Sequence, residues 1–326
     1  MKVKVLSKTQ VAALGIGMRD IMDGLIEGWK LMAASDSGVE LPPKIGIHPR
    51  QDCYIHAMPC YVKKLDTAII KWAAGYPPNF EKKLPFINGL IVVNNPETGL
   101  VECIMDSALI TAWRTGAATG VCAQLMSAPG IESAAIIGTG VQGMATAAAL
   151  KEGLPELKEL RIFDLTASQM DRFVGEVSPQ CPGIEIVKTQ SAQKCVDGAE
   201  VIATSIPTVE RPKPFIEKAW LKSDALVITE DHDAAVCPEV MRDGTFICDY
   251  RRQYLQFQRL GLSFKDYPKE EGIYADMSEI CSGAKAPVKT GLRGAVLMGI
   301  AMHDVMTVRL VMDKLSGSAI GQEVEI

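Results

Sequence analysis

Three glycines, Gly138, Gly140 and Gly143, are spaced as in turns that bind a phosphate group. An apolar run, 134–137, precedes them, and a small-residue segment with strong helix preference follows, which predicts a strand, a tight turn and a helix. In such a turn the first glycine allows the bend, the second lets the backbone approach a pyrophosphate, and the third lets helix and strand pack closely. Because free N–H groups at the positive helix end face the anion, we expect a phosphate cradle here.

An acidic residue, Asp164, ends a second predicted strand about two dozen residues further on, where dinucleotide-binding folds place the acceptor for the adenosine ribose hydroxyls. Its charge would repel a ribose phosphate and no arginine immediately follows it, so the sequence favours NAD over NADP. The alternative is a glycine-rich turn in another kind of α/β protein. Thr139 and Ser205 are candidates to line the cofactor, and each could equally be a turn residue. The residues expected to contact the cofactor are Arg114, Gly138, Thr139, Gly140, Val141, Gln142, Gly143, Asp164, Thr204, Ser205 and Gly299.

Three basic residues, Lys71, Arg114 and Lys44, are candidates for a functional role. Lys71 lies in an apolar predicted strand, where a lysine is costly unless it projects into a cleft or reaches the surface. Arg114 lies in a predicted helix among small residues that would let another element approach. Lys44 follows two prolines that fix the backbone and can direct its side chain. The alternative is that the strand lysine and the helix arginine are ordinary surface residues.

Acids and a histidine from Glu230 to Asp233 directly follow another predicted strand. The carboxyl ends of parallel strands are where such folds bind their ligands. Asp231, His232 and Asp233 could indicate a metal, but no other His, Cys or acid grouping supplies matching ligands, so no metal is expected. A solvated acidic loop is the remaining alternative.

The elements that must position these residues form two groups. The first has an amphipathic helix over Met18–Ala34 and about five strands before the glycine motif, with little helix between them. Its expected extended segments are 41–44, 52–58, Thr67–Ala73, and a hairpin of Ile87–Asn94 with Leu100–Met105. This pattern predicts a separate α+β domain with an antiparallel or mixed sheet.

A helix over 106–127, with Asp106 or Ser107 as its N-cap, leads into the second group. Strands and helices then alternate, which predicts an α/β Rossmann domain with a doubly wound, mostly parallel sheet. Gly299–Leu315 has helical period and is expected to return the chain to the first domain. The expected division is a discontinuous α+β substrate-binding domain of residues 1–117 and 303–326, and an NAD-binding domain of residues 118–302.

The composition suits an ordinary globular protein with about two domains, since 326 residues with 48% hydrophobic content can bury large cores. A net charge of −5 offers no general attraction to nucleic acid or to an anionic membrane. Because the start lacks a signal-peptide pattern and the apolar runs are short, a cytoplasmic location is expected. Nine cysteines without a Cys-x-x-Cys pair suit reduced thiols.

Taken together, these segments resemble the ornithine cyclodeaminase/μ-crystallin family. The matching motifs are Pro42-Pro-Lys44, Ala57-Met-Pro59, Ile70-Lys-Trp72, Tyr76-Pro-Pro-Asn79, Pro96-Glu-Thr-Gly99, Met105-Asp106, Leu109-Ile-Thr111, Arg114-Thr-Gly-Ala-Ala118, Ile137–Gly143 and Gly299–Asp304. The resemblance implies a homodimer built through the non-Rossmann domain, with substrate between the domains. Members of the family include ornithine cyclodeaminases, archaeal alanine dehydrogenases, ketimine and pyrroline-carboxylate reductases, and thyroid-hormone-binding μ-crystallins.

The resemblance also assigns roles. Lys44, Lys71 and Arg114 are similar in position to the residues that bind the substrate carboxylate, and Asp233 to the acid that handles the proton at the reacting nitrogen. Cations gathered on one anionic group in a dry cleft would bind an amino or imino acid strongly, which agrees with that assignment.

The departures from the family pattern bear on the substrate. Lys44 follows the alanine dehydrogenase pattern, where cyclodeaminases resemble one another in carrying arginine. His56 stands where cyclodeaminases tend to have Glu and alanine dehydrogenases Arg. Phe86 replaces a common threonine, and Leu297-Met298 a more polar pair. These changes, with His56 and Phe86 taken as substrate-binding residues, favour an apolar or ring-shaped side chain over ornithine.

The leading hypothesis is an NAD(H)-dependent oxidoreductase that transfers hydride between nicotinamide and the α-carbon of a small amino acid or its cyclic or acyclic imine. Such an enzyme would be an amino acid dehydrogenase or a ketimine reductase. The second hypothesis is a cyclodeaminase-type lyase that releases ammonia and recycles its NAD internally. The third is a non-catalytic, μ-crystallin-like protein that binds NAD(P) and a small ligand. Lys71, Arg114 and Asp233 argue against the third, while His56 and Phe86 leave it open.

Overall fold

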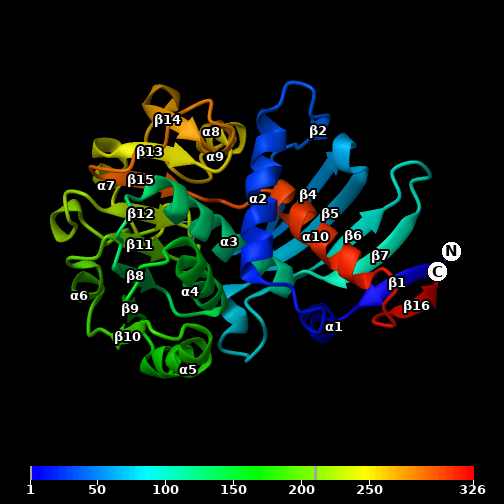
Figure 1. The fold of residues 1–326 in the computed structure, drawn as a ribbon, viewed down its shortest axis with the longest axis horizontal. Coiled ribbons are helices and arrows are strands. Elements are labelled where there is room, and N and C mark those ends of the chain that lie inside the picture. The colour runs from blue at the N-terminus through cyan, green and yellow to red at the C-terminus, as the bar shows by residue number, and fades with distance from the viewer. Residues whose placement is uncertain (1, 209–210) are drawn as a thin grey trace. The chain divides into compact units, whose positions relative to one another are not determined.

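The computed structural model describes residues 2–208 and 211–326, which form two compact units (Figure 1). Unit 1 runs to Arg114 and takes in Ile300–Ile326, and unit 2 is Thr115–Gly299. In the described part of the chain, no helix is both long and apolar enough to cross a bilayer.

Unit 1 is built on a mixed sheet with the strand order β16-β1-β7-β6-β5-β4-β2, and β3 pairs with β4. The strands are β1 (Lys2–Leu6), β2 (Val39–Glu40), β3 (Ile45–Arg50), β4 (Cys53–Val62), β5 (Thr67–Gly75), β6 (Ile87–Asn94), β7 (Val101–Asp106) and β16 (Gln322–Glu325). β6 and β7 form the expected antiparallel hairpin, whereas β1 runs parallel to β7. The expected mixed α+β architecture is therefore confirmed.

Two helices, α2 (Met18–Ala33) and α10 (Ala301–Leu315), cover one face of this sheet (Figure 1). A Cβ on Gly28 of α2 would lie 2.8 Å from the Met306 side chain of α10, so the glycine allows the close approach of the two helices. Because side chains alternate along β5, Lys71 lies buried on the helix-covered face while Trp72 lies half exposed on the other. A short helix, α1 (Lys8–Ala12), follows β1.

The strand count of this unit was underestimated from the sequence. The described residues form seven strands before the glycine motif rather than about five, and 41–44 form none of them. β1 was missed because its pairing partners, β7 and β16, come from distant parts of the chain. Short strands of this kind are fixed by tertiary pairing more than by local propensity.

Unit 2 contains a sheet in which every pairing between described strands is parallel, in the order β10-β9-β8-β11-β12-β15-β13-β14. The strands are β8 (Ser133–Ile137), β9 (Glu159–Phe163), β10 (Glu185–Lys188), β11 (Val201–Thr204), β12 (Leu226–Thr229), β13 (Thr245–Cys248), β14 (Ile273–Asp276) and β15 (Arg293–Val296). The doubly wound parallel sheet is confirmed. β14 and β15 were not expected from the sequence, although they are as long as β10, β11, β12 and β13.

The helices associated with this sheet are α3 (Ala108–Met126), α4 (Val141–Gly153), α5 (Ala167–Val177), α6 (Ala192–Val196), α7 (Pro238–Asp243), α8 (Arg251–Arg259) and α9 (Met277–Cys281). α3 and α4 pack with no room for a side chain between them. A Cβ on Gly116 would lie 2.5 Å from the backbone of Ala145, and one on Gly120 would lie 2.7 Å from the carbonyl oxygen of Ala149. The small residues after Arg114 thus serve the close helix approach that the sequence indicated.

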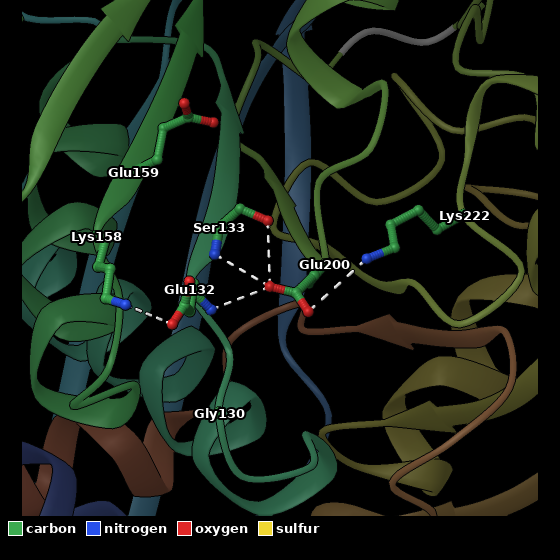
Figure 2. Close-up of a pocket in the computed structure, with 7 residues that line it drawn as sticks. All are labelled: Gly130, Glu132, Ser133, Lys158, Glu159, Glu200 and Lys222. Atoms are coloured by element: carbon green, nitrogen blue, oxygen red, sulfur yellow. Dashed lines mark hydrogen bonds and ion pairs between the residues drawn. The ribbon is translucent and has the colours of Figure 1, made fainter.

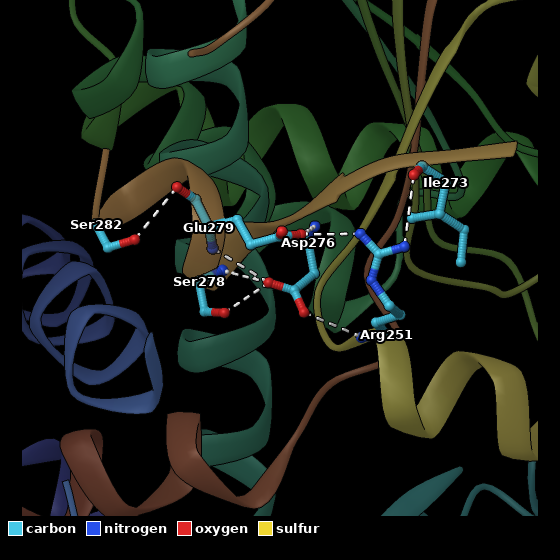
Figure 3. Close-up of polar contacts among 6 residues, drawn as sticks. All are labelled: Arg251, Ile273, Asp276, Ser278, Glu279 and Ser282. Atoms are coloured by element: carbon cyan, nitrogen blue, oxygen red, sulfur yellow. Dashed lines mark hydrogen bonds and ion pairs between the residues drawn. The ribbon is translucent and has the colours of Figure 1, made fainter. Parts of the chain in front are cut away.

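Polar contacts fix the end of the sheet at β14 (Figure 3). The Asp276 carboxylate accepts hydrogen bonds from the backbone N–H groups of Ser278 and Glu279, and so caps α9. Arg251 at the start of α8 pairs with Glu279 at 2.9 Å. These contacts join α8, β14 and α9.

Candidate active site

Three charged side chains from distant segments meet inside unit 1, and we call Lys71, Arg114 and Asp304 the cation cluster. The Lys71 Nζ lies 2.8 Å from each carboxylate oxygen of Asp304, and the Arg114 Nε lies 3.4 Å from one of them. Lys71 and Asp304 are fully buried and Arg114 is 7% exposed. Two cations thus share one carboxylate, which leaves the cluster with one positive charge in excess.

The electrostatic state of Lys71 reflects this environment. Burial and the neighbouring Arg114 lower the pKa of the Lys71 amine to about 8, while Asp304 acts in the opposite direction. Asp304 lies in the first turn of α10, where the helix dipole stabilises an anionic side chain. From the sequence, Asp304 stands out only as the end of a family motif. An acid within the mostly apolar segment Ala301–Val308 was the signal that could have singled it out.

A stacked pair of rings, Tyr54 and His56, lies on β4 with ring centroids 4.3 Å apart. Two glycines leave space for the rings, since a Cβ on Gly46 or Gly75 would lie 2.3 Å from His56 or Tyr54 respectively. Burial, and then the charge of Lys44, lower the pKa of His56 to about 3. Burial raises the pKa of Tyr54 to about 12. The stacked pair is therefore uncharged at neutral pH.

Lys44 and Phe86 are the remaining residues expected to bind the substrate. Lys44 lies between β2 and β3, is 8% exposed, and is close enough to His56 to act on its pKa. Phe86 is half-buried just before β6, and its carbonyl oxygen accepts a hydrogen bond from the Tyr76 N–H at 2.9 Å. The structure thus joins Lys71 with Arg114 and Lys44 with His56, and it fixes Phe86 through its backbone.

The glycine-rich turn of unit 2 shows three different steric situations. Gly138 has a φ of +96°, and a Cβ there would lie 2.7 Å from the Ser205 carbonyl oxygen. A Cβ on Gly143 would lie 2.1 Å from the Gly138 carbonyl oxygen, whereas one on Gly140 would meet no described atom within 4 Å. Gly140 also begins α4 without a side-chain cap among the described residues. An open backbone at an uncapped helix start fits a pyrophosphate.

Asp164 lies directly after β9 and is bound to the glycine-rich turn. One of its carboxylate oxygens accepts hydrogen bonds from the N–H and the hydroxyl of Thr139, at 2.9 and 3.0 Å, and the other from the Thr166 N–H at 3.0 Å. A carboxylate has about four lone-pair sites, so Asp164 retains capacity for a ribose hydroxyl. These residues fit a dinucleotide.

The other expected cofactor residues mostly brace this turn. The Ser205 hydroxyl donates to the Gly138 carbonyl oxygen at 3.0 Å, and the buried Thr204 hydroxyl donates to Asp231 at 2.8 Å. Gly299 has a φ of +76°, and both of its backbone groups are engaged, by Asp249 at 2.7 Å and Gln253 at 3.1 Å. Exposed Val141 and half-buried Gln142 begin α4.

The acidic residues after β12, Glu230, Asp231 and Asp233, point to different partners. Glu230 accepts hydrogen bonds from the hydroxyls of Thr119 and Thr146, at 2.6 Å each. Asp231 also accepts from the Ile206 N–H at 3.0 Å, and burial raises its pKa to about 7.

Asp233 is held by an unusual stretch of backbone. Its carboxylate accepts a hydrogen bond from the Phe264 N–H at 2.6 Å, and burial raises its pKa. His232 and Phe264 both have positive φ, 61° and 67°, and their rings lie 5.4 Å apart. The Nδ1 of His232 lies 3.2 Å from the Ser263 hydroxyl. Such strain persists only where the surroundings fix the backbone, so the Asp233 position is well defined.

A cavity of about 420 Å³ lies elsewhere on unit 2 (Figure 2). Its charged groups include Lys158, paired with Glu132, and Lys222, paired with Glu200 at 3.7 Å. Ser133 and Glu159 begin their strands here, so the cavity is at the amino ends of the strands. Ligands of doubly wound sheets bind at the carboxyl ends, and the cavity is therefore separate from the candidate site.

The parallel sheet with its glycine-rich turn, and the mixed sheet that carries the cation cluster, define a two-domain protein of the Rossmann class. Within that class, the chain belongs to the ornithine cyclodeaminase/mu-crystallin family, whose sequence pattern matches residues 2–319. The resemblance stated from the motifs is confirmed.

Individual relatives cover nearly the whole chain. The nodulation efficiency protein NfeD of Rhizobium meliloti is 31% identical over 310 residues, which are 93% of this chain and 92% of that protein. An alanine dehydrogenase of Archaeoglobus fulgidus is 22% identical over 100% of this chain and 99% of its own. The solved Delta(1)-pyrroline-2-carboxylate reductase of Thermococcus litoralis, in complex with NADH and L-proline, superposes with a TM-score of 0.88. It is 23% identical and covers 99% of this chain and 100% of its own, so this likeness shows the shared fold.

Proposed function

We propose that this protein is an NAD(H)-dependent oxidoreductase that acts between a small α-amino acid and its imine, as an amino acid dehydrogenase or a ketimine reductase. The observation that carries the proposal is the buried cation cluster, in which Lys71 and Arg114 share the single carboxylate of Asp304. A carboxylate ligand would neutralise the remaining positive charge. The relatives named as alanine dehydrogenase and as pyrroline-carboxylate reductase support this substrate class.

The cofactor would be held by the residues of unit 2 that fit a dinucleotide. The open backbone at Gly140 would take the pyrophosphate, and Asp164 would accept the ribose hydroxyls. NAD is proposed rather than NADP because the Asp164 carboxylate, fixed by Thr139, would repel a ribose phosphate. When bound, the nicotinamide supplies or takes the hydride.

On the substrate side, Lys71 and Arg114 would bind the carboxylate through charge-assisted hydrogen bonds. The stacked pair of Tyr54 and His56 adds uncharged rings close to the same cations, since Arg114 acts on the pKa of Tyr54 and Lys71 on that of His56. Neutral rings supply no carboxylate for the terminal amine of ornithine. We therefore propose a small, neutral or ring-shaped side chain, which disfavours the cyclodeaminase alternative.

Asp233 is proposed as the group that carries the proton to and from the reacting nitrogen. A general acid or base works best when its pKa lies near the working pH, and burial moves the pKa of Asp233 upward in that direction. The Phe264 N–H holds one oxygen of the carboxylate at 2.6 Å. The other oxygen is the one that would exchange the proton.

The proposal is tested by mixing the protein with NADH, or NADPH, and a panel of five- and six-membered cyclic imino acids and α-keto acids with ammonia. We expect NADH oxidation with at least one imino acid. Lys71→Met should lower kcat/KM about a hundredfold or more, because it removes one partner of a buried charge pair. Lys64→Met, which changes an exposed lysine paired with Asp36, is the matched control. Ammonia release from ornithine without net change in NADH would instead favour the lyase.

We also propose that the protein is a homodimer, with the uncovered face of the unit 1 sheet at the interface. Ile45, Ala57, Trp72 and Leu90 are cross-strand neighbours on this face. Ile45 is 66% exposed, and Trp72 and Leu90 are each 49% exposed, so the face presents a continuous apolar surface. A related archaeal alanine dehydrogenase, with a TM-score of 0.84, was solved as a dimer with bound NAD.

Light scattering during size-exclusion chromatography tests the dimer. Leu90→Glu should give monomers, because it places a charge in the apolar face. Leu165→Glu changes a residue that is 94% exposed in unit 2 and should leave the dimer intact. A wild-type monomer, or a dimer that survives Leu90→Glu, would contradict the proposed interface.

A further inference from the structure

We infer that Asp304 is a positioning residue of the carboxylate site, which holds Lys71 and Arg114 in place and sets the charge that they present to the substrate. The inference rests on the proposed function, because it names the group that holds the two cations assigned to the substrate carboxylate. Asp304 itself is not proposed to touch the substrate.

The geometry of the contact is that of a fixed counter-ion. The Lys71 Nζ is equidistant from the two carboxylate oxygens of Asp304, at 2.8 Å, and Arg114 approaches one of the same oxygens at 3.4 Å. The three residues come from β5, α3 and α10, so one carboxylate joins three elements. The flexible lysine is thereby held in one orientation.

The charge balance explains why a carboxylate is needed at this position. Two cations in a dry interior repel each other, and each loses its hydration. These two costs destabilise the fold unless a buried anion compensates the positive charges. Asp304 supplies that partner and leaves one positive charge on the cluster. One monoanionic head group, such as the carboxylate of an amino or imino acid, would complete the balance.

Among the described residues, the other titratable groups that interact with the cluster are uncharged at neutral pH or are cations. His303 precedes Asp304 on α10, its ring meets Trp29 edge-on at 4.6 Å, and burial with Arg114 and Lys71 lowers its pKa far below its usual value. Burial raises the pKa of the Cys60 thiol to about 12, with Asp304 acting in the same direction. The described groups of β4 on which the cluster acts are Tyr54, His56 and Cys60, and Lys44, in the loop before β3, acts on His56. Asp304 is therefore the anion that acts on Lys71.

Removal of this anion has a consequence that a general packing defect would not have. Burial and Arg114 both favour the neutral amine of Lys71, and Asp304 opposes them. In Asp304→Asn the amine should lose its proton below neutral pH. The variant should then bind a carboxylate weakly at about pH 8 and recover most of its affinity at about pH 6.

The first measurement is the titration of Lys71 itself, which does not depend on any activity. Protein labelled with [13C]lysine is followed by NMR, and Lys71→Arg assigns the signal. We expect the wild-type amine to titrate near pH 8 and the Asp304→Asn amine at least about one pH unit lower. Thr307→Val, which removes a buried hydroxyl one turn further along α10, is the control and should leave the titration unchanged.

The second measurement is the binding of pyrrole-2-carboxylate, a planar ring acid that cannot be reduced, by calorimetry. Asp304→Asn should bind it about tenfold more weakly than wild type at about pH 8, with the difference closing toward about pH 6. Asp304→Glu keeps the charge but moves it, so it should keep the wild-type pH profile with about tenfold lower affinity. If Asp304→Asn does not fold, Asp304→Glu carries the test.

The outcomes separate the inference from the proposed function. Wild-type protein that binds the carboxylate, together with an Asp304→Asn variant that keeps the wild-type Lys71 titration and pH profile, would overturn the inference alone. Unchanged affinity in Asp304→Glu would do the same. Wild-type protein that binds no carboxylate at either pH would overturn the proposed function and the inference with it.

Discussion

The two units bury their charged groups in opposite ways. In unit 1, Lys71 and Arg114 are paired with the carboxylate of Asp304. In unit 2, the carboxylates of Glu230 and Asp231 accept hydrogen bonds from threonine hydroxyls and backbone N–H groups instead. The first arrangement leaves a positive charge that an anionic ligand can complete. The second holds both acids in fixed positions, and burial raises the pKa of Asp231 to about 7.

This difference indicates that unit 2 is suited to proton transfer and unit 1 to anion binding. Burial without a cation raises the pKa of a carboxylate, which is what a proton carrier requires, while paired cations stay charged and bind anions. Changes to the acids or to the glycine-rich turn of unit 2 should therefore affect proton transfer, stability or cofactor binding rather than carboxylate binding in unit 1.

The largest effect is expected from Asp233→Asn. If Asp233 carries the proton, its loss should lower kcat about a hundredfold to a thousandfold while the KM for the substrate carboxylate changes little. Steady-state kinetics with the best substrate of the panel measure both. Asp266→Asn, at an exposed acid that acts on the pKa of Asp233, should change kcat far less. A fully active Asp233→Asn variant would show that Asp233 does not carry the proton.

The glycine-rich turn offers a matched pair of variants. Gly143→Ala should lower the free energy of unfolding by about 3 kcal/mol, because the new Cβ would lie 2.1 Å from the Gly138 carbonyl oxygen. Gly140→Ala should leave stability unchanged, since its Cβ meets open space, and should instead weaken NADH binding about tenfold. Thermal unfolding without cofactor and fluorescence titration with NADH separate the two. A destabilised Gly140→Ala with normal NADH affinity would contradict the cradle.

The raised pKa of Asp231 predicts a pH dependence of stability. Its pKa is raised to about 7 in the folded protein, so between about pH 4 and 7 the folded state binds the proton that the unfolded state has lost. Stability should therefore fall by about 4 kcal/mol as pH rises through this window, and Asp231→Asn should remove most of that fall. Urea unfolding at several pH values measures it. Asp171→Asn, at an exposed acid of the same unit, should keep the wild-type pH dependence of the free energy of unfolding. A wild-type pH dependence in Asp231→Asn would show that Asp231 does not cause it.

The smallest effect concerns the choice of cofactor. Asp164→Ser removes the charge but keeps a hydroxyl near Thr139, and it should raise the affinity for NADPH relative to NADH about tenfold. Equilibrium titration with both cofactors gives the ratio. Carboxylate binding in unit 1 should not change. An unaltered ratio would show that Asp164 does not discriminate between the cofactors.

The features that the sequence predicted well are local ones. The spacing of Gly138, Gly140 and Gly143 lies within one strand-turn-helix unit. In the structure Gly138 has a positive φ and Gly143 lies against the Gly138 carbonyl oxygen, while the phosphate contact of Gly140 stays a prediction. The doubly wound sheet was likewise predicted from the alternation of strands and helices. Local patterns suffice for both because the contacts involved are short in sequence.

The cation cluster could be predicted only in part. Lys71 and Arg114 were identified as cations, but the carboxylate that joins them lies 233 residues after Lys71. The acids after β12 were noticed as a group, yet the partners of Glu230, Thr119 and Thr146, come from two separate helices. Charge pairing over such separations depends on tertiary structure, which no local pattern encodes.

The contact between α3 and α4, where Gly116 and Gly120 meet the backbone of Ala145 and Ala149, bears on how this chain can be recombined with its relatives. A methyl group at Gly116 or Gly120 would clash with the α4 backbone, so the position of α4 depends on these two glycines of α3. A chimera that takes α3 from one parent and α4 from another would have a steric mismatch at this buried contact, which surface substitutions cannot correct. The two helices must be transplanted as one block, and Arg114, two residues before Gly116, travels with them.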